Sequence, residues 1–392
     1  MKNLVTILLA FCLSGCELES RTPDLSGVPV RLTIMHTSDI HSRIFPYEMV
    51  PQFTDEEMGL HEENGPFGGA ARMATILHEE RRRSSRVLHL DSGDVFQGAP
   101  VFNLYSGEVE VRMHNQFKTD AVVAGNHEFD EGASNYARQL SNFAAFPTLA
   151  ANYHFFDPER PYNNDLRDLV DTVAVFGLDG LSVGVVGMAN LSSITSIHEP
   201  DNSMDVLAQE TMATVMRYTA ELAPIVDIVI VLTHLSLDDD VEIARRDPNV
   251  DIVLGGHLHV ALDPAKVVDS EVVEGKRVVV SHAGAFAKYI QRLDFIVQDG
   301  DVITHTNTLI PIDARIPEDG AMKYMLQEYE QGLAEAFDLQ RVVARTDDRL
   351  YRFGTSGGDS PLGNLVVEAM QLFPGIQADF GLTNSLGIRT DI

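Results

Sequence analysis

The fold is set by the stretch Ile228-Val229-Ile230-Val231-Leu232-Thr233-His234. Four of its first five side chains are β-branched, which favours an extended strand. A run of this kind, with no alternation of polar residues, is typical of a strand buried on both faces of a parallel sheet. His234 follows where such a strand ends. We therefore expect a buried sheet that presents polar side chains at the carboxyl ends of its strands.

Similar apolar runs recur along the chain. They are Leu32–Met35, Val87–Leu90, Ala121–Ala124, Leu181–Val186, Ile252–Leu254 and Val278–Val280. Between them lie amphipathic stretches such as Ala70–Arg83 and Val206–Leu222, in which apolar residues recur at helical spacing. This alternation of strands and helices predicts an α/β domain.

Five short motifs follow these runs or end them. They are Asp39-Ile40-His41, Gly93-Asp94, Gly125-Asn126-His127-Glu128, Thr233-His234 and Gly255-Gly256-His257-Leu258-His259. Each motif alone is common in turns, but together they supply carboxylate, imidazole and amide ligands. Such a set suits Zn, Mn, Fe or Co better than Ca or Mg, and the sequence does not choose among those four. The motifs predict a site for two divalent cations, which can grip both the attacking and the leaving oxygen of a phosphoryl transfer.

Individual residues in these motifs suggest different roles. Asp94 follows a glycine, and a carboxylate between two cations is a natural bridge. Asn126 can ligate a metal without adding charge. His127 and Asp130 lie three residues apart, so the carboxylate can orient the imidazole for proton transfer; a core histidine with a satisfied hydrogen bond is the structural alternative. Structural, surface or supporting roles are expected for the other histidines considered, His36, His89, His198 and His282.

The composition indicates a globular and strongly acidic protein. Hydrophobic residues make up 44% of the chain, enough for a substantial core. The 58 Asp and Glu residues outnumber the 29 Lys and Arg residues, which gives a formal net charge of −29. A nucleic-acid polymer is an unexpected partner, because its binding needs clustered cations. A length of 392 residues predicts two or three domains.

The first residues are typical of a targeting segment. An apolar stretch leads into Leu13-Ser14-Gly15-Cys16, which resembles a bacterial lipoprotein cleavage box. We therefore expect a signal peptide over residues 1–16, a lipid on Cys16 and a polar tether over residues 17–30. An ordinary secretory peptide with an incidental cysteine is the alternative. The expected location is the cell envelope (periplasm or outer membrane), with contact to the membrane only through that lipid.

The last part of the chain changes character. Apolar residues recur at helical spacing over 317–338, which predicts a single linker helix. Residues 31–316 before it form the predicted catalytic domain. Residues 339–392 form the predicted start of a second α/β domain, which is too short to bury a core of its own. Within it, Asp379 to Ile392 has the composition of a strand and a turn.

Taken together, the motifs resemble those of the calcineurin-like metallophosphatase superfamily. Within it they are similar to the bacterial 5′-nucleotidase/UDP-sugar hydrolase family, in its lipoprotein form. The resemblance runs from about Leu32 to Ile312 and implies a four-layer αββα sandwich. It implies one cation held by Asp39, His41, Asp94 and His259. It implies a second held by Asp94, Asn126, His234 and His257, with Asp94 as the bridge. His127 and Asp130 match the catalytic pair of the family.

The tail carries a second part of this resemblance. Ser360-Pro361-Leu362-Gly363-Asn364-Leu365 is similar to the start of the family's substrate domain, and residues 384–389 are similar to one of its loops. By that match Asn384 and Arg389, together with Asn126, would contact the substrate. Two features depart from the family. The stretch Gly354–Asp359 lacks the usual arginine, which Arg352 could replace, and the sequence ends before the aromatic pair that would sandwich a base.

The predicted function is hydrolysis of nucleoside 5′-monophosphates with release of phosphate. Three alternatives keep the chemistry and change the substrate: a cyclic-nucleotide phosphodiesterase, a UDP-sugar hydrolase and a thiosulfohydrolase-like relative. Another alternative is a non-catalytic surface lipoprotein that binds metal or nucleotide. A pure binder needs the metal ligands but has no use for the pair formed by His127 and Asp130, which favours an enzyme acting on a small nucleotide or phosphoester.

Overall fold

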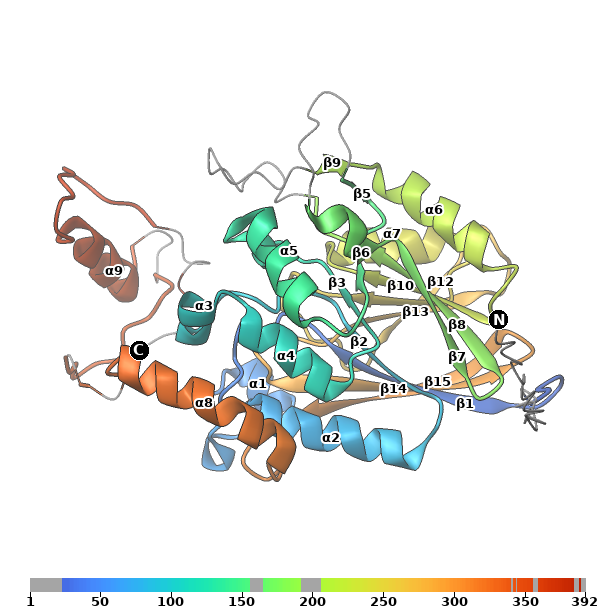
Figure 1. The fold of residues 1–392 in the computed structure, drawn as a ribbon, viewed down its shortest axis with the longest axis horizontal. Coiled ribbons are helices and arrows are strands. Elements are labelled where there is room, and N and C mark those ends of the chain that lie inside the picture. Colours follow the sequence, from blue (N-terminus) through green and yellow to red (C-terminus); the bar gives the residue numbers. More distant parts are fainter. Residues whose placement is uncertain are drawn as a thin grey trace, which may run out of the picture. The chain divides into compact units, whose positions relative to one another are not determined.

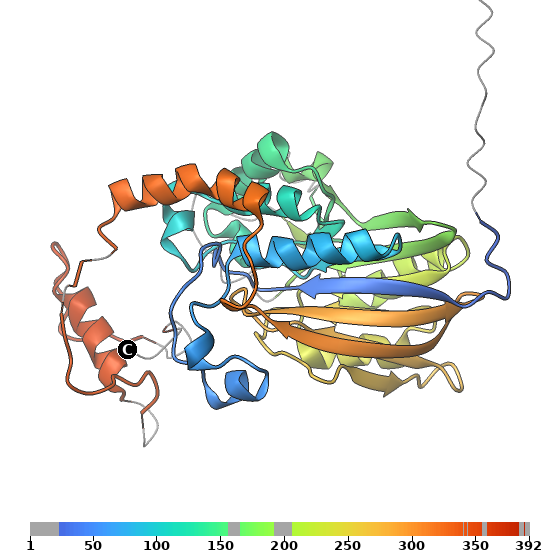
Figure 2. The ribbon, with the colours of Figure 1, turned by 90° about the horizontal axis from the view of Figure 1, so that it is seen from below.

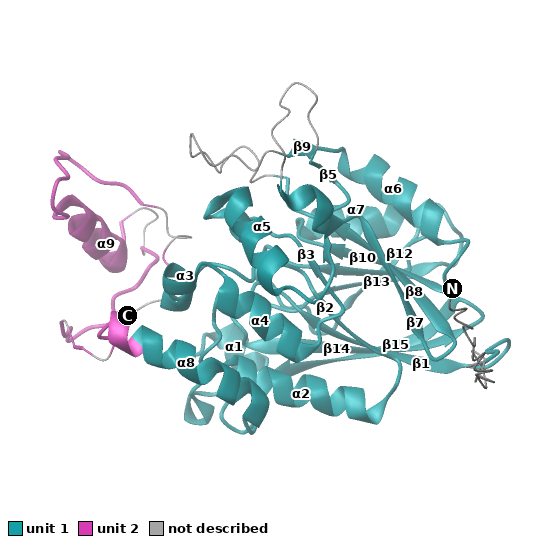
Figure 3. Ribbon diagram, in the orientation of Figure 1, with its two compact units in different colours: residues 1–333 teal, residues 334–392 magenta. Residues whose placement is uncertain are grey.

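The structure is a computed structural model, and it describes residues 23–155, 165–191, 206–339, 341–342, 344–354, 359–383 and 388. The predicted signal peptide lies outside the described residues. So do four residues singled out from the sequence, Cys16, His198, Asn384 and Arg389. The chain divides into two compact units, residues 1–333 and 334–392 (Figure 3). None of the described helices combines the length and the apolar character that crossing a membrane requires.

The first sheet of unit 1 contains the parallel strands that follow the N-terminus. Among the described residues its order is β15 (Asp301–Pro311), β14 (Tyr289–Gln298), β1 (Val30–Thr37), β2 (Val87–Asp91), β3 (Ala121–Val123), β4 (Thr148–Leu149) and β6 (Val170–Asp171). The strands from β1 to β6 pair in parallel, so their carboxyl ends share one edge. β14 and β15 add an antiparallel extension, which lies outside the apolar runs from which the strands were predicted.

The second sheet is built around the stretch that set the fold. Its order among the described residues is β12 (Lys266–Asp269), β13 (Arg277–His282), β11 (Ile252–Gly255), β10 (Ile228–Thr233), β8 (Leu181–Met188) and β7 (Val173–Leu178). The four central strands run parallel, and β12 and β7 are antiparallel edges. Every residue of β10 is buried, which confirms the prediction of a strand covered on both faces.

Helices cover the outer face of each sheet. The described helices of unit 1 are α1 (Phe53–Glu57), α2 (Ala70–Arg83), α3 (Pro100–Tyr105), α4 (Glu108–Phe117), α5 (Gly132–Phe143), α6 (Thr211–Leu222), α7 (Leu237–Arg246) and most of α8 (Gly320–Ala336). Short 3₁₀ turns occur at η1 (Glu62–Asn64), η2 (His127–Phe129) and η3 (Asp165–Asp168). The C-cap residues of α3 and α4, Ser106 and Lys118, both have a left-handed backbone.

The predicted helix Val206–Leu222 is wrong over its first five residues. Leu207–Ala208 forms strand β9, which pairs with β5 (Tyr153–His154). The helix begins only at Thr211, because the Glu210 side chain accepts hydrogen bonds from the backbone N–H groups of Met212 and Ala213. Such a cap satisfies N–H groups that a helix start leaves without partners. By contrast, the prediction of Ala70–Arg83 agrees with α2 at both ends.

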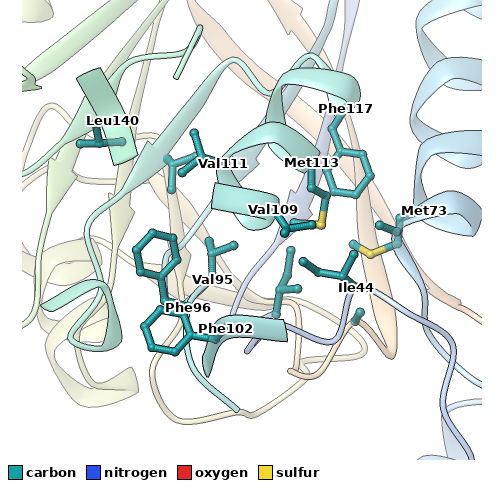
Figure 4. Packing of buried hydrophobic residues seen from close by; sticks show 14 of the residues in the cluster. Ile44, Met73, Val95, Phe96, Phe102, Val109, Val111, Met113, Phe117 and Leu140 are labelled. Carbon is teal, nitrogen blue, oxygen red and sulfur yellow. The ribbon is translucent and has the colours of Figure 1, made fainter. Parts of the chain in front are cut away.

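Three apolar layers hold unit 1 together. Between the sheets, Ile34 and Leu90 pack with Ile230 and Leu254 in one buried cluster. The outer face of the first sheet packs against α2, α4 and α5, and the outer face of the second packs against α6 and α7 (Figures 1 and 2). Helix α8 adds Leu326 and Tyr329 to the first of these layers, where the Tyr329 ring lies against Tyr105 of α3. Figure 4 shows part of the first helical layer, in which Phe117 lies among buried methionine and aliphatic side chains. This arrangement is the predicted αββα sandwich.

The acidic insertion Pro46–Gly65 has the glycine and proline content that predicts a surface loop, but the structure shows more order there. It contains α1 and η1, and its Leu60 is fully buried against Phe67 and Tyr289. A buried Asp55 accepts hydrogen bonds from Lys288 and from the Tyr289 hydroxyl, which fastens the insertion to the start of β14. The acidic composition of the insertion gives no sign of this small apolar cluster, which Leu60 forms with Phe67, Tyr289 and Leu309.

Unit 2 contains α9 (Pro361–Gln371) among its described residues. The hydroxyl of Ser360 caps this helix by accepting from the N–H of Gly363. No strand occurs in the described part of the predicted strand and turn, residues 379–383 and 388. Helix α8 (Gly320–Ala336) covers most of the predicted linker, residues 317–338, and the boundary between the units lies inside this helix, after Leu333. The predicted domain limits of 31–316, 317–338 and 339–392 stay predictions.

Candidate metal centre

The sheets bring the five sequence motifs together at one edge of unit 1. β1, β2 and β3 run parallel, so Asp39, Asp94 and Asn126 follow their carboxyl ends. β10 and β11 do the same in the second sheet, where they deliver His234 and His257. Candidate ligand atoms from both sheets lie within 4.8 Å of one another in shared groups. The convergence follows from the parallel pairing, which places all of these loops on one side.

One group of ligand atoms comes from Asp39, His41 and His259. The two imidazole Nε2 atoms lie 2.9 Å apart, and Nε2 of His259 lies 3.6 Å from Oδ1 of Asp39. Asp39 and His41 are fully buried, whereas His259 is partly exposed. The backbone N–H of His257 donates to both carboxylate oxygens of Asp39, at 3.0 and 3.1 Å, and so fixes the orientation of that carboxylate.

A second group comes from Asp94, His234 and His257. Nε2 of His234 lies 3.0 Å from Oδ2 of Asp94 and 3.2 Å from the amide oxygen of Asn126. The rings of His234 and His257 lie 5.1 Å apart between centroids and are tilted by 59°. Oδ2 of Asp94 also lies 3.9 Å from Nε2 of His41, so this carboxylate reaches both groups.

The spacing of these atoms fits cation coordination. Metal–nitrogen and metal–oxygen bonds of ~2.0–2.2 Å place neighbouring ligand atoms ~3–3.5 Å apart. The separations between 2.9 and 3.6 Å within the two groups agree with that spacing. The ligands are nitrogen and oxygen atoms only, as expected for a chain whose cysteines lie at positions 12 and 16. Each group could therefore hold a divalent cation.

Burial sets the electrostatics of these groups. Desolvation raises the pKa of Asp39 to about 8, and the negative charge of Asp94 adds to this effect. Burial also acts to raise the pKa of Asp94, but His234, His127 and His41 hold it well below its ordinary value. For His234, burial acts to lower the pKa, yet the carboxylates of Asp94 and Asp39 raise it to about 10. A buried cluster of this kind calls for compensating positive charge, which a cation supplies.

His127 and Asp130 form a pair at the edge of these groups. Nδ1 of His127 lies 2.7 Å from Oδ2 of Asp130, and both side chains are partly exposed. Burial acts to lower the pKa of His127, but the hydrogen bond with Asp130 and the nearby charge of Asp94 outweigh it, so the pKa lies above its ordinary value. The backbone N–H of His127 also donates to Oδ1 of Asp94, at 2.8 Å. The pair is thus anchored to the carboxylate that reaches both ligand groups.

Several groups that support the ligands were not identified from the sequence. Nδ1 of His234 lies 2.6 Å from the carbonyl oxygen of Ser92, and Nδ1 of His41 lies 3.1 Å from that of Gln97. Such contacts fix the orientation of a ligating imidazole. The ring of Phe286 lies 5.5 Å from the ring of His41 and 4.9 Å from that of His259. Backbone carbonyls and an aromatic ring distant in the sequence carry no motif that would have revealed them.

Backbone strain concentrates around the candidate ligands. Of the thirteen non-glycine residues with positive φ in the described chain, seven lie in the loops that carry them, and these are Asp39, His41, Ser42, Asp94, Gln97, His257 and His259. Two more, Phe286 and Ala287, lie in the loop before β14, where the ring of Phe286 contacts the rings of His41 and His259. Left-handed conformations cost of order 1 kcal/mol each and persist only where the surroundings enforce them. The loops are therefore shaped by their contacts and not by local preference.

The three described histidines for which the sequence predicts structural or supporting roles have hydrogen-bond partners. Nε2 of His36 lies 2.8 Å from the Ser92 hydroxyl, and Nε2 of His282 lies 2.8 Å from Asp240. His89 contacts the hydroxyls of Thr37 and Thr119. These contacts agree with the structural or supporting roles expected from the sequence. In unit 2, Arg352 donates to the carbonyl of Ile388, at 3.2 Å.

Comparison with known proteins gives a consistent set of relatives. The family described as calcineurin-like phosphoesterase matches residues 32–261. The snake venom 5′-nucleotidase of Crotalus adamanteus is 29% identical over 305 residues, which cover 74% of this chain and 50% of that protein. The 5′-nucleotidase of Bos taurus is 29% identical over 364 residues, which cover 87% of this chain and 60% of that protein.

A solved structure extends the comparison to the fold. The crystal structure of a 5′-nucleotidase precursor from Thermus thermophilus has a TM-score of 0.75 and 28% sequence identity, and the match covers 87% of this chain and 66% of that one. The chain thus spans 50% to 66% of the length of these three relatives. Because the family match covers more than half of the 392 residues and contains all five motifs, the chain belongs to the calcineurin-like phosphoesterase family.

Proposed function

We propose that the chain is a phosphohydrolase that uses two divalent cations and releases phosphate from nucleoside 5′-monophosphates. One observation carries this proposal. The Asp94 carboxylate lies beside both groups of nitrogen and oxygen ligands. The same carboxylate accepts a hydrogen bond from the backbone N–H of His127, whose imidazole is paired with Asp130. A site that only bound metal would need the ligand groups and not the pair.

The proposed ligand assignment follows the two groups. Asp39, His41, Asp94 and His259 would hold the first cation, and Asp94, Asn126, His234 and His257 would hold the second, so that Asp94 would serve both. The distances from 2.9 to 3.9 Å among these side chains support this division. Zn, Mn, Fe or Co suits such a mixed nitrogen and oxygen set.

The chemistry then divides between the cations and the chain. When bound, two divalent cations generate a nucleophile from water near neutral pH and stabilise charge on phosphoryl oxygens. The side chain of Asn126 turns its oxygen to His234, and its NH₂ group can donate to a phosphoryl oxygen. His127 shares its Nδ1 with Asp130, which leaves Nε2 to hold the proton that the departing oxygen takes. Asp130 keeps this imidazole protonated at higher pH than an isolated one.

The nucleotide part of the proposal rests on the relatives. Two of them are named 5′-nucleotidase and one is a 5′-nucleotidase precursor. The predicted substrate contacts Asn384 and Arg389 lie outside the described residues and stay predictions. With a formal net charge of −29, the chain must draw a phosphate through local positive charge, which the cations supply.

The test is phosphate release from AMP by the purified chain. Metal-free protein is supplied in turn with Mn, Co and Zn, and each reaction is repeated with excess chelator. We expect release with at least one metal and none with chelator. Parallel reactions with 2′,3′-cyclic AMP, UDP-glucose and p-nitrophenyl phosphate test the alternatives, and their own products are measured: adenosine monophosphates, UMP with glucose 1-phosphate, and p-nitrophenol. Release of phosphate from p-nitrophenyl phosphate but not from AMP would reject the nucleotide substrate. No product from any substrate with any metal would reject a phosphohydrolase in favour of a binding protein.

We also propose that the protein is exported and anchored through a lipid on Cys16, as the box Leu13-Ser14-Gly15-Cys16 indicates. Replacement of Cys16 by Ser removes the thiol that would carry the lipid. The variant should move from the membrane fraction to the soluble fraction of the envelope. Retention of the variant in the membrane fraction would contradict lipid anchoring at this residue.

A further inference from the structure

Glu128 is a buried carboxylate that the proposed chemistry does not use. It lies in η2, beside His127, and only 2% of the residue is exposed. Both of its oxygens accept backbone hydrogen bonds. Oε1 accepts from the N–H groups of Val95 (2.7 Å) and Phe96 (3.3 Å), and Oε2 accepts from those of Asp94 (3.1 Å) and Gly125 (2.7 Å).

These four donors belong to two different loops. Asp94 to Phe96 follow β2, and Gly125 follows β3. Three consecutive N–H groups that converge on one anion form a concave arrangement that backbone segments use to hold negative charge. Charge-assisted hydrogen bonds of this type are about twice as strong as neutral ones. One side chain therefore holds together the loop that carries Asp94 and the loop that carries Asn126 and His127.

The two loops are also joined without Glu128. Oδ1 of Asp94 accepts a hydrogen bond from the backbone N–H of His127, at 2.8 Å, so here the loop after β2 supplies the carboxylate and the loop after β3 supplies the donor. Two glycines permit the close approach. A Cβ on Gly93, whose φ is +83°, would lie 2.6 Å from the carbonyl oxygen of Val123, and a Cβ on Gly125 would collide with the backbone and carboxylate of Asp94. The packing leaves these loops little freedom to slide.

The backbone hydrogen bonds that both oxygens of Glu128 accept distinguish it from the candidate metal ligands and from another buried acid. It is absent from the described groups of side chains that could hold a cation, because its oxygens face backbone N–H groups. Glu110 gives a useful contrast. It is fully buried in α4 beside the Ser42 hydroxyl, and among the described residues no hydrogen bond of ordinary length and angle reaches either of its carboxyl oxygens.

We propose that Glu128 is a positioning residue, which sets the Asp94 carboxylate and the Asn126–His127 segment at the separation that cation binding requires. The proposal rests on the proposed two-cation site. Glu128→Gln keeps the shape of the side chain but replaces one oxygen by an NH₂ group, which then faces two N–H donors. Loss of a partner that orients a metal ligand typically costs 10- to 100-fold in metal affinity or activity.

The experiment compares Glu128→Gln with wild type and with Glu110→Gln, a matched loss of a buried carboxylate. Manganese is added to each metal-free protein, its affinity is measured by calorimetry, and spin coupling between paired Mn ions is followed by electron paramagnetic resonance. We expect Glu128→Gln to bind Mn at least ~10-fold more weakly and to lose much of the coupled signal. Glu110→Gln should keep both wild-type values.

Two outcomes would overturn the positioning role. One is wild-type Mn affinity and an unchanged coupled signal in Glu128→Gln. The other is an equal loss in both variants, which would mean that removal of any buried carboxylate has this effect. These readouts involve no substrate, so the absence of phosphate release from the wild type would reject the proposed function and leave this test intact.

A further measurement needs no variant, and so covers the case in which Glu128→Gln does not fold. Hydrogen exchange of the metal-free wild type reports on the amides of Asp94, Val95, Phe96 and Gly125. We expect these loop amides to exchange as slowly as those of the adjacent strands β2 and β3, because each is hydrogen-bonded to a buried carboxylate. Exchange at the rate of an exposed loop would contradict the proposal that Glu128 holds the two loops through these hydrogen bonds.

Discussion

Replacement of His127 by Ala tests the proposed division of labour most directly. The imidazole is hydrogen-bonded to Asp130 at 2.7 Å, whereas the contact with Asp94 comes from the backbone N–H of His127. An alanine keeps that backbone contact. The substitution should therefore remove the proton donor while leaving the geometry of the Asp94 carboxylate in place.

The expected size of the effect follows from this structure. Loss of a positioned proton donor costs typically 10²- to 10⁴-fold in rate, and loss of one stabilising donor costs ~10²–10³-fold. A fall in kcat of ~10²–10³-fold corresponds to ~2.7–4 kcal/mol of transition-state stabilisation. The imidazole ring also lies in a possible ligand group with His41 and Asp94, so a role as metal ligand is the specific rival explanation.

The assay measures phosphate release from AMP and, on the same samples, bound metal by elemental analysis. Full metal content with a rate ~10²–10³-fold below wild type would support the proton donor. A near-normal kcat with metal retained would refute the reasoning. Loss of metal in parallel with rate would instead make His127 a ligand. Asp130→Asn serves as a control for mechanism: because Asp130 raises the pKa of His127, its loss should shift the basic limb of the pH–rate profile to lower pH.

Three further predictions concern other parts of the chain. Asp94→Asn should leave fewer than two ions per chain in elemental analysis as well as lower the rate, because both ligand groups lose a carboxylate, and unchanged metal content would argue against a bridge. Asp319→Ala should lower the free energy of unfolding in urea by ~1 kcal/mol, since Asp319 accepts from the first N–H groups of α8, whereas Asp319→Asn should cost little; equal effects would rule out the cap. Burial lowers the pKa of His114 to about 3. Between pH values of about 3 and 6.5 this residue is therefore protonated in the unfolded chain but neutral in the folded chain. Metal-free His114→Gln should therefore lose less stability than wild type between those pH values, by ~1.4 kcal/mol per pH unit, and parallel pH curves would contradict this.

The strands and helices with strong periodicity were predictable from the sequence. The run Ile228–Leu232 became β10 with one added residue, and Ala70–Arg83 became α2. β14 was missed although its buried and half-buried side chains alternate from Gln291 to Gln298, because its apolar residues recur with a period of two instead of forming one long run. The start of α6 was misplaced because Val206 and Leu207 continue the apolar spacing, while the cap at Glu210 decides where the helix begins.

The candidate site divides in the same way. Side chains with ligand chemistry at strand ends, such as Asp39 and His234, are visible in the sequence because parallel strands force their loops to one edge. The contacts that orient them are not. The carbonyl of Ser92 and the ring of Phe286 reach their histidines only through the packing of the two sheets and the loop before β14. Glu128 was visible in its motif, but its four backbone partners depend on tertiary structure.

The left-handed residues have a consequence for protein engineering. Ser106 and Lys118 cap α3 and α4, and neither residue belongs to the candidate ligand groups or to the proposed chemistry. Glycine at either position should raise the free energy of unfolding by up to ~1 kcal/mol, because glycine adopts the left-handed conformation without steric penalty. The same exchange at Gln97 would relax the segment whose carbonyl steadies His41. Substitutions intended to stabilise the protein can therefore be made at these two helix ends, whereas the left-handed residues around the candidate ligands should be kept.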